Sequence, residues 1–187
     1  GIADHSKQDF FLDAMRGSLA MATRLNAAAV VVAGGPAVAG ATDAAQHAAM
    51  VEALRRIAPA AEMARKQILL EPLNNRVDHP GMFMNTAREG LDMVAEVDSP
   101  MIRLLYDMYH SAVMGESPEN VVPGRADLIG YVQVADVPGR NEPGSGTIDW
   151  RSGMAVLRTA GYDGPIGLEY RPTGSTLESL ARARPHS

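Results

Sequence analysis

Short apolar runs alternate with amphipathic stretches along the chain, and this alternation predicts strands and helices in turn. The apolar runs are continuous and rich in Val, Ile and Leu, which is typical of parallel strands buried on both faces. The stretches between them place apolar residues at helical spacing. The predicted strands cover residues 27–33, 67–70, 101–106, 129–135 and 165–168.

Polar residues mark where the predicted helices begin. Thr86 and Glu89 have the spacing of a capping box, and Asp149 precedes another helix. Ser6 is the predicted N-cap of the first helix. Proline cannot donate a backbone hydrogen bond, so Pro59 is expected to kink or divide the helix that contains it.

The order of elements is one helix followed by five strand–helix units. Such an order predicts an α/β fold with a parallel sheet and right-handed crossovers. No linker or low-complexity segment interrupts it, so residues 1–187 are predicted to form a single domain.

Composition narrows the classes of partner. The chain has 187 residues and a net charge of −5, without a dense block of Lys and Arg, so neither nucleic acid nor a membrane surface is a predicted partner. No apolar run approaches the roughly 20 residues that a membrane-spanning helix needs. The absence of cysteine excludes disulfides and thiolate metal sites and is compatible with a reducing compartment, so we expect a cytoplasmic protein.

Each of the last four predicted strands has an oxygen-bearing side chain near its carboxyl end. These ends lie side by side at one rim of a parallel sheet. Carboxylates gathered there would raise one another's pKa unless a cation were bound, and oxygen donors without His or Cys suit Mg²⁺ or Mn²⁺. A single such carboxylate is more often a helix N-cap, a salt-bridge partner or a solvated residue, but four in succession favour a metal site. The four residues are Glu71, Asp107, Gln133 and Glu169.

Four further polar residues lie close to these strand ends. His110 is either a hydrogen-bonded loop histidine or a contact for a substrate oxygen, and Arg140 is either a surface residue or a clamp for an anionic substrate. His79 and Glu142 are weaker candidates, for which a structural role in a loop is the simpler interpretation.

Motifs at these strand ends resemble those of hydroxypyruvate isomerases, which belong to the xylose isomerase-like group of TIM barrels. The match is specific in combination, and the segment around Gln133 is its most specific part. Gln at this position, where the epimerase branch looks to carry His, favours the hydroxypyruvate branch. The motifs are LEPLN at 70–74, DHPG at 78–81, LYDMYH at 105–110, QVADVPGR at 133–140 with EPG at 142–144, and GYDG at 161–164 with GLEYRP at 167–172.

The resemblance implies a (β/α)₈ TIM barrel, of which this chain holds only the last five strands. Such a barrel takes about 250 residues and eight strands. The missing strands are expected before Gly1, either in a longer form of this chain or supplied by another chain, because five parallel strands cannot close the barrel.

The resemblance also implies a reaction and a role for each site residue. Hydroxypyruvate and tartronate semialdehyde would interconvert through a metal-stabilised ene-diolate. Glu71, Asp107, Gln133 and Glu169 would bind one divalent metal, Mg²⁺ or Mn²⁺. Glu71 and Glu169 would also be the acid/base pair, while His110 and Arg140 would contact substrate oxygens.

Other functions remain open from sequence alone. A related ketose or sugar isomerase, or a 3-epimerase, would use the same site. A non-catalytic sugar-binding barrel would bind metal without turnover. A metal-dependent endonuclease would be expected to carry many His ligands and a basic groove, which five His and a net charge of −5 do not favour. A homo-oligomer is plausible from the resemblance.

Overall fold

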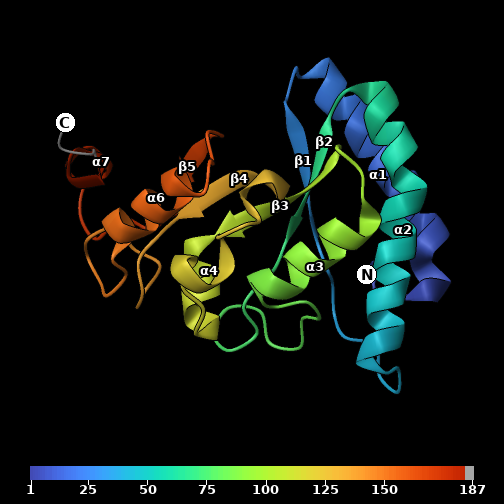
Figure 1. Ribbon diagram of the computed structural model, residues 1–187, viewed down its shortest axis with the longest axis horizontal. Coiled ribbons are helices and arrows are strands. Elements are labelled where there is room, and N and C mark those ends of the chain that lie inside the picture. Colours follow the sequence, from blue (N-terminus) through green and yellow to red (C-terminus); the bar gives the residue numbers. More distant parts are fainter. Residues whose placement is uncertain (184–187) are drawn as a thin grey trace.

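Five parallel strands form the centre of the computed structural model, which describes residues 1–183 (Figure 1). They are ordered in the sheet as they are in the sequence, and each pairs in parallel with the next. The predicted strand positions are confirmed to within about two residues at each end. The strands are β1 (Ala29–Ala33), β2 (Gln67–Glu71), β3 (Ile102–Asp107), β4 (Ile129–Val134) and β5 (Ile166–Leu168).

Helices connect successive strands, as the alternating pattern predicted. Figure 1 shows α1 and α2 at one end of the molecule and α6 and α7 at the other, with the sheet between them. The helices are α1 (Gln8–Arg24), α2 (Asp43–Ala64), α3 (Ala87–Val97), α4 (Met108–Met114), α5 (Pro118–Val121), α6 (Trp150–Thr159) and α7 (Thr176–Ala183), with 3₁₀ turns η1 (His5–Lys7) and η2 (Ala126–Leu128). Within residues 1–183, none of the helices has the length and apolar character that crossing a membrane requires.

Two of the predicted helix starts are confirmed and one is wrong. Thr86 and Glu89 form the full capping box of α3, and Asp149 accepts a hydrogen bond from the backbone of α6. Ser6 does not cap α1, because its hydroxyl and backbone N–H both donate to Asp4, which caps the preceding 3₁₀ turn.

Pro59 does not divide α2, which is continuous from Asp43 to Ala64. The residues around the proline explain why, because Ile57 and Ala61 are fully buried and Ala58 nearly so. Burial of this face offsets the hydrogen bond that proline cannot donate.

The two faces of the sheet differ at its β1 edge. Val30 and Val32 pack against the core formed with the helices, whereas Val31, which points to the opposite face, is 52% exposed. Side chains alternate between the faces of a strand, so Val31 lies on the face that a closed barrel would enclose. The open sheet is therefore part of a barrel with its interior exposed along this edge.

Candidate functional site

The carboxyl ends of the strands place the four predicted ligand residues along one rim. Glu71 and Asp107 are the last residues of β2 and β3, and Glu169 directly follows β5. Asp107 is the direct register partner of Gln133 on β4. Four residues that are distant in sequence thus share one edge of the sheet because the strands are parallel and consecutive.

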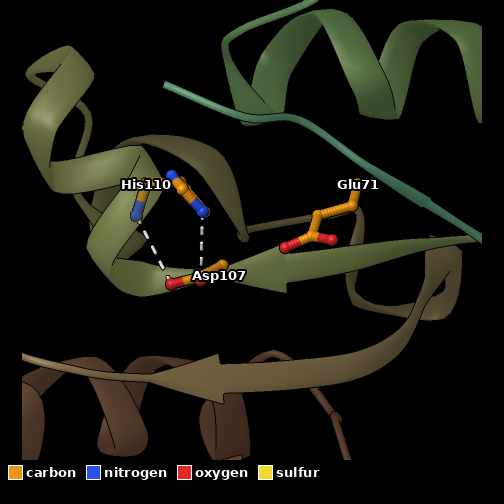
Figure 2. A group of neighbouring side chains, drawn as sticks. All are labelled: Glu71, Asp107 and His110. Atoms are coloured by element: carbon orange, nitrogen blue, oxygen red, sulfur yellow. Dashed lines mark hydrogen bonds and ion pairs between the residues drawn. The ribbon is translucent and has the colours of Figure 1, made fainter. Parts of the chain in front are cut away.

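Glu71, Asp107 and His110 form the tightest cluster at this rim. Each offers a potential ligand atom within 4.8 Å of the others, and Figure 2 shows Glu71 and His110 approaching Asp107 from two sides. Asp107 and His110 are almost fully buried.

Asp107 uses its two carboxylate oxygens differently. Oδ1 accepts backbone hydrogen bonds from Tyr109 at 2.8 Å and His110 at 3.4 Å and so caps α4. Oδ2 faces Arg140 at 3.3 Å and His110 Nε2 at 3.7 Å. The residue is therefore an N-cap, as a lone carboxylate at a strand end often is, and still presents one oxygen to the site.

Arg140 lies between two of the predicted ligands. Its Nη2 donates to Asp107 Oδ2 and makes a short hydrogen bond with Glu169 Oε2. Its guanidinium also sits over the Tyr109 ring, 5.1 Å from the ring centroid. A positive charge thus neutralises the carboxylates at the point where the sequence predicted a cation.

Desolvation and neighbouring charge shift the pKa values of Glu71 and Asp107. Desolvation, followed by repulsion from Asp107 and Glu169, raises the pKa of Glu71 to about 7. Desolvation raises the pKa of Asp107 to about 7 as well, against the opposing effect of Arg140. Both carboxyls are therefore poorly compensated when ionised, which a bound cation would correct.

The donor set at the rim fits a hard divalent cation. It contains three carboxylates, which are ligands that Mg²⁺ and Mn²⁺ prefer. Gln133 adds an amide oxygen that is buried and accepts no hydrogen bond from residues 1–183. A buried acceptor without a partner is costly, so this oxygen is suited to a ligand.

A hydrogen-bond network that runs from the buried Asn74 to the exposed Asp78 supports His110. The backbone N–H and the side-chain amide of Asn74 both contact His110 Nδ1, at 3.2 and 2.6 Å. Asp78 accepts from the Asn74 amide at 2.7 Å and from the Tyr109 hydroxyl at 2.8 Å. Burial, Arg140 and His79 lower the pKa of His110 to about 4, so the ring is neutral near pH 7.

Sequence reasoning did not identify Asn74, Asp78 or Tyr109 as site residues. Asn74 and Asp78 lie in two of the quoted motifs, directly after the strand that ends in Glu71. A polar side chain three residues past a strand end was the available signal, but only the structure shows that Asn74 is fully buried.

The loop that carries Arg140 is folded around the carboxylate of Asp136. This buried group accepts backbone hydrogen bonds from Val137, Gly144 and Ile148 at 2.8 to 3.0 Å. The backbone of Arg171 also donates to the carbonyl of Arg140 at 2.7 Å. The backbone of Arg140 is therefore held in place, while its side chain reaches into the site.

The two weaker candidates take different positions. The His79 ring packs against His110 with centroids 5.5 Å apart, so His79 borders the site. Glu142 is buried and accepts hydrogen bonds from the backbone and hydroxyl of Thr173. Glu142 thus joins the loop after β4 to the segment after β5.

Comparison with known proteins identifies the family. The sequence profile described as "Xylose isomerase-like TIM barrel" matches residues 1–186. The chain belongs to this family. Membership confirms the predicted fold class and the resemblance on which the sequence analysis relied.

Relatives within the xylose isomerase-like TIM barrel family include named isomerases. The chain is 35% identical over 143 residues to the hydroxypyruvate isomerase of Escherichia coli, covering 75% of this chain and 54% of that protein. It is 35% identical over 136 residues to a 2-oxo-tetronate isomerase of Cupriavidus necator, covering 71% and 52%. The chain thus spans about half the length of these relatives.

A solved structure of the family confirms the arrangement of the strands and helices. The crystal structure described as AP endonuclease, family 2 from Brucella melitensis superimposes with a TM-score of 0.87 at 27% identity. The match covers 100% of this chain and 71% of that one. The five-stranded sheet is therefore the partial barrel that the sequence predicted.

Proposed function

We propose that this protein is a metal-dependent isomerase that interconverts hydroxypyruvate and tartronate semialdehyde. The observation that carries the proposal is the rim of three carboxylates and one buried amide oxygen, with Arg140 beside them to bind an anionic substrate. Two relatives whose alignments cover more than two thirds of this chain are named as isomerases, which supports the same reaction class.

Glu71, Asp107, Gln133 and Glu169 would hold the divalent metal. Once bound, the ion would supply Lewis-acid polarisation of the substrate carbonyl and stabilise negative charge on the substrate oxygens. The raised pKa values of Glu71 and Asp107 support this assignment, because they mark carboxyls whose burial and mutual repulsion Arg140 alone does not compensate.

Glu71 and Glu169 are the proposed acid/base pair. The isomerisation moves one proton from the hydroxyl-bearing carbon to the neighbouring carbonyl carbon and a second from the hydroxyl oxygen to the carbonyl oxygen, and two carboxylates at the substrate can relay these protons. Glu71 is suited to this because its pKa of about 7 lies near working pH. The side chain of Glu169 is 49% exposed, which supports its proposed contact with substrate.

Arg140 and His110 are the proposed substrate contacts. The Arg140 guanidinium can form a bidentate pair with the substrate carboxylate, exchanging its partners Asp107 and Glu169 for the substrate. His110 is buried beside Asp107 and can hydrogen-bond a substrate oxygen from Nε2.

A second candidate is an isomerase of a longer 2-oxo acid with the same site. The Cupriavidus relative favours it, because its name describes a four-carbon 2-oxo acid as substrate. The site residues proposed above would serve both acids, so a substrate panel has to distinguish them.

The test is isomerisation of hydroxypyruvate by the full-length protein after chelation and again with Mg²⁺ or Mn²⁺ restored. We expect turnover that depends on the metal. Turnover of only a longer 2-oxo acid or a ketose would show that hydroxypyruvate is not the substrate. Metal binding without any turnover would contradict the isomerase activity and indicate a binding protein.

The variant Glu169→Gln tests the acid/base assignment within the same assay. General acid/base groups contribute about 10²- to 10⁴-fold, so kcat should fall at least 100-fold while the metal still binds. Glu62→Gln on the exposed side of α2 is the matched control and should leave kcat unchanged. Near-full activity of Glu169→Gln with metal bound would contradict the assignment.

A further inference from the structure

We propose that Asn74 is a positioning residue that fixes His110 in the tautomer with its proton on Nε2. His110 then presents an N–H donor to the substrate and is not a ligand of the metal. The catalytic part of this inference rests on the proposed function, whereas the tautomer itself does not.

The orientation of the Asn74 amide is settled by its own hydrogen bonds. Its Oδ1 accepts from the backbone N–H groups of Val77 and Asp78, both at 3.1 Å. The NH₂ end therefore faces Asp78 Oδ2 at 2.7 Å and His110 Nδ1 at 2.6 Å. Turning the amide over would oppose oxygen to the Asp78 carboxylate and lose the bonds from the Val77 and Asp78 backbones and to Asp78 Oδ2.

Two donors converge on His110 Nδ1. One is this NH₂ group, and the other is the backbone N–H of Asn74 at 3.2 Å. The backbone N–H can only donate and the oriented NH₂ group donates as well, so with both donors present Nδ1 supplies its lone pair and carries no proton. The imidazolium form is excluded for the same reason, and the single ring proton lies on Nε2.

The protonated nitrogen faces the site. His110 Nε2 is buried, has no hydrogen-bond partner in the part of the chain that the structure describes, and lies 3.7 Å from Asp107 Oδ2. A buried donor without a partner is suited to an incoming acceptor, and a substrate hydroxyl or carbonyl oxygen provides one.

The same argument separates His110 from the metal ligands. His110 clusters with Glu71 and Asp107, so proximity alone would make it a ligand. A metal-binding imidazole nitrogen has to be unprotonated. Because Nδ1 accepts from two donors, Nε2 cannot lose its proton without leaving an anionic ring. The metal is therefore bound by the oxygen ligands alone.

Nitrogen NMR of the histidine side chains in the full-length protein tests the tautomer directly. The signals of His110 are assigned by their disappearance in His110→Gln. We expect a protonated Nε2 and an unprotonated Nδ1 near neutral pH, both in the metal-free protein and after saturation with Mg²⁺. A proton on Nδ1, or loss of the Nε2 proton when Mg²⁺ binds, would overturn the proposal.

The variant Asn74→Asp tests the positioning role. It keeps an oxygen for Val77 and Asp78 but replaces the NH₂ by an acceptor, which needs a proton on His110 Nδ1. The introduced carboxylate takes the 2.6 Å position of the NH₂ group and should outweigh the longer backbone contact at 3.2 Å, so we expect the ring proton to shift to Nδ1 and kcat to fall at least tenfold. A histidine in the wrong tautomer costs a serine protease about 10⁴ in kcat.

Asn75→Asp is the matched control, since it adds the same charge one residue away and no hydrogen bond joins Asn75 to His110 among residues 1–183. It should leave tautomer and kcat unchanged. An unshifted tautomer in folded Asn74→Asp would refute the role of Asn74. If Asn74→Asp does not fold, the wild-type spectrum still decides the tautomer. Absence of isomerase activity in a protein with protonated Nε2 would refute only the proposed function.

Discussion

Arg140 supplies the positive charge in the carboxylate cluster. It pairs with Asp107 and Glu169, two of the residues proposed to bind the metal, while its backbone is held by the loop around Asp136. A metal at the proposed site would compete with this pairing for the same oxygens. The Arg140 side chain would have to release them for the metal to bind.

Replacing Arg140 by glutamine should tighten metal binding. The variant removes a competitor and the repulsion between two cations. Losing a charge-assisted hydrogen bond of about 1.5 kcal/mol corresponds to about a tenfold lower Kd for Mn²⁺, measured by calorimetry. The KM for hydroxypyruvate should rise in the same variant. Arg158→Gln on the exposed side of α6 is the control, and an unchanged or higher Kd in Arg140→Gln would contradict the competition.

Residue positions were predictable from sequence where the sheet determines them. Glu71, Asp107, Gln133 and Glu169 had to lie along one rim because each is at or next to the carboxyl end of a parallel strand of one sheet, and the register pairs Asp107 directly with Gln133. Their roles as ligands and catalysts stay predictions.

The contacts of Arg140 and Asn74 were not predictable, because they depend on loop conformation. Arg140 adopts a left-handed backbone with φ of 56°, and Asn74 closes a turn through its own side chain. Neither conformation follows from hydrophobic spacing.

At the scale of the elements, local capping signals were dependable and packing effects were not. The capping box at Thr86 and the cap at Asp149 follow from residues within one helical turn, and both are confirmed. The continuity of α2 through Pro59 depends on burial against distant parts of the chain. A few neighbouring residues in the sequence cannot predict packing against distant parts of the chain.

Replacing Thr86 by alanine should destabilise the protein by about 1 kcal/mol. The backbone N–H of Glu89 would lose its acceptor, although Glu116 would still accept from Ala87 and Arg88 at the same helix end. Urea unfolding measures the change in the free energy of unfolding. Thr86→Ser keeps the hydroxyl and should behave as wild type, and an unchanged midpoint for Thr86→Ala would show that the capping box contributes nothing.

For the whole molecule, the site reduces stability as its carboxyls ionise. Glu71 has a pKa of about 7 in the folded protein, above its ordinary value of 4.5. The folded state therefore holds more protons between these values, so stability falls as pH rises through this range. The loss of stability caused by ionisation of Glu71 is complete at pH values above the pKa of Glu71 in the folded protein.

Comparing wild type with Glu71→Gln isolates this effect in metal-free protein. The variant should gain stability relative to wild type as pH rises from about 4.5 to about 7, and the difference should level off above that range. Chemical denaturation at several pH values in the presence of a chelator measures it. A pH-independent difference would mean that the Glu71 carboxyl ionises as easily in the folded state as in the unfolded chain.

Glu169 follows β5, which is the last strand of the sheet and pairs only with β4 among the described residues. One member of the proposed proton-transfer pair is therefore attached to an edge that is free to accept another strand. A strand that paired with this free edge of β5 would support the segment that carries Glu169 on the side opposite β4. Completing the sheet and completing the proposed reaction centre would then be a single event, and the proposed activity would depend on closure of the barrel.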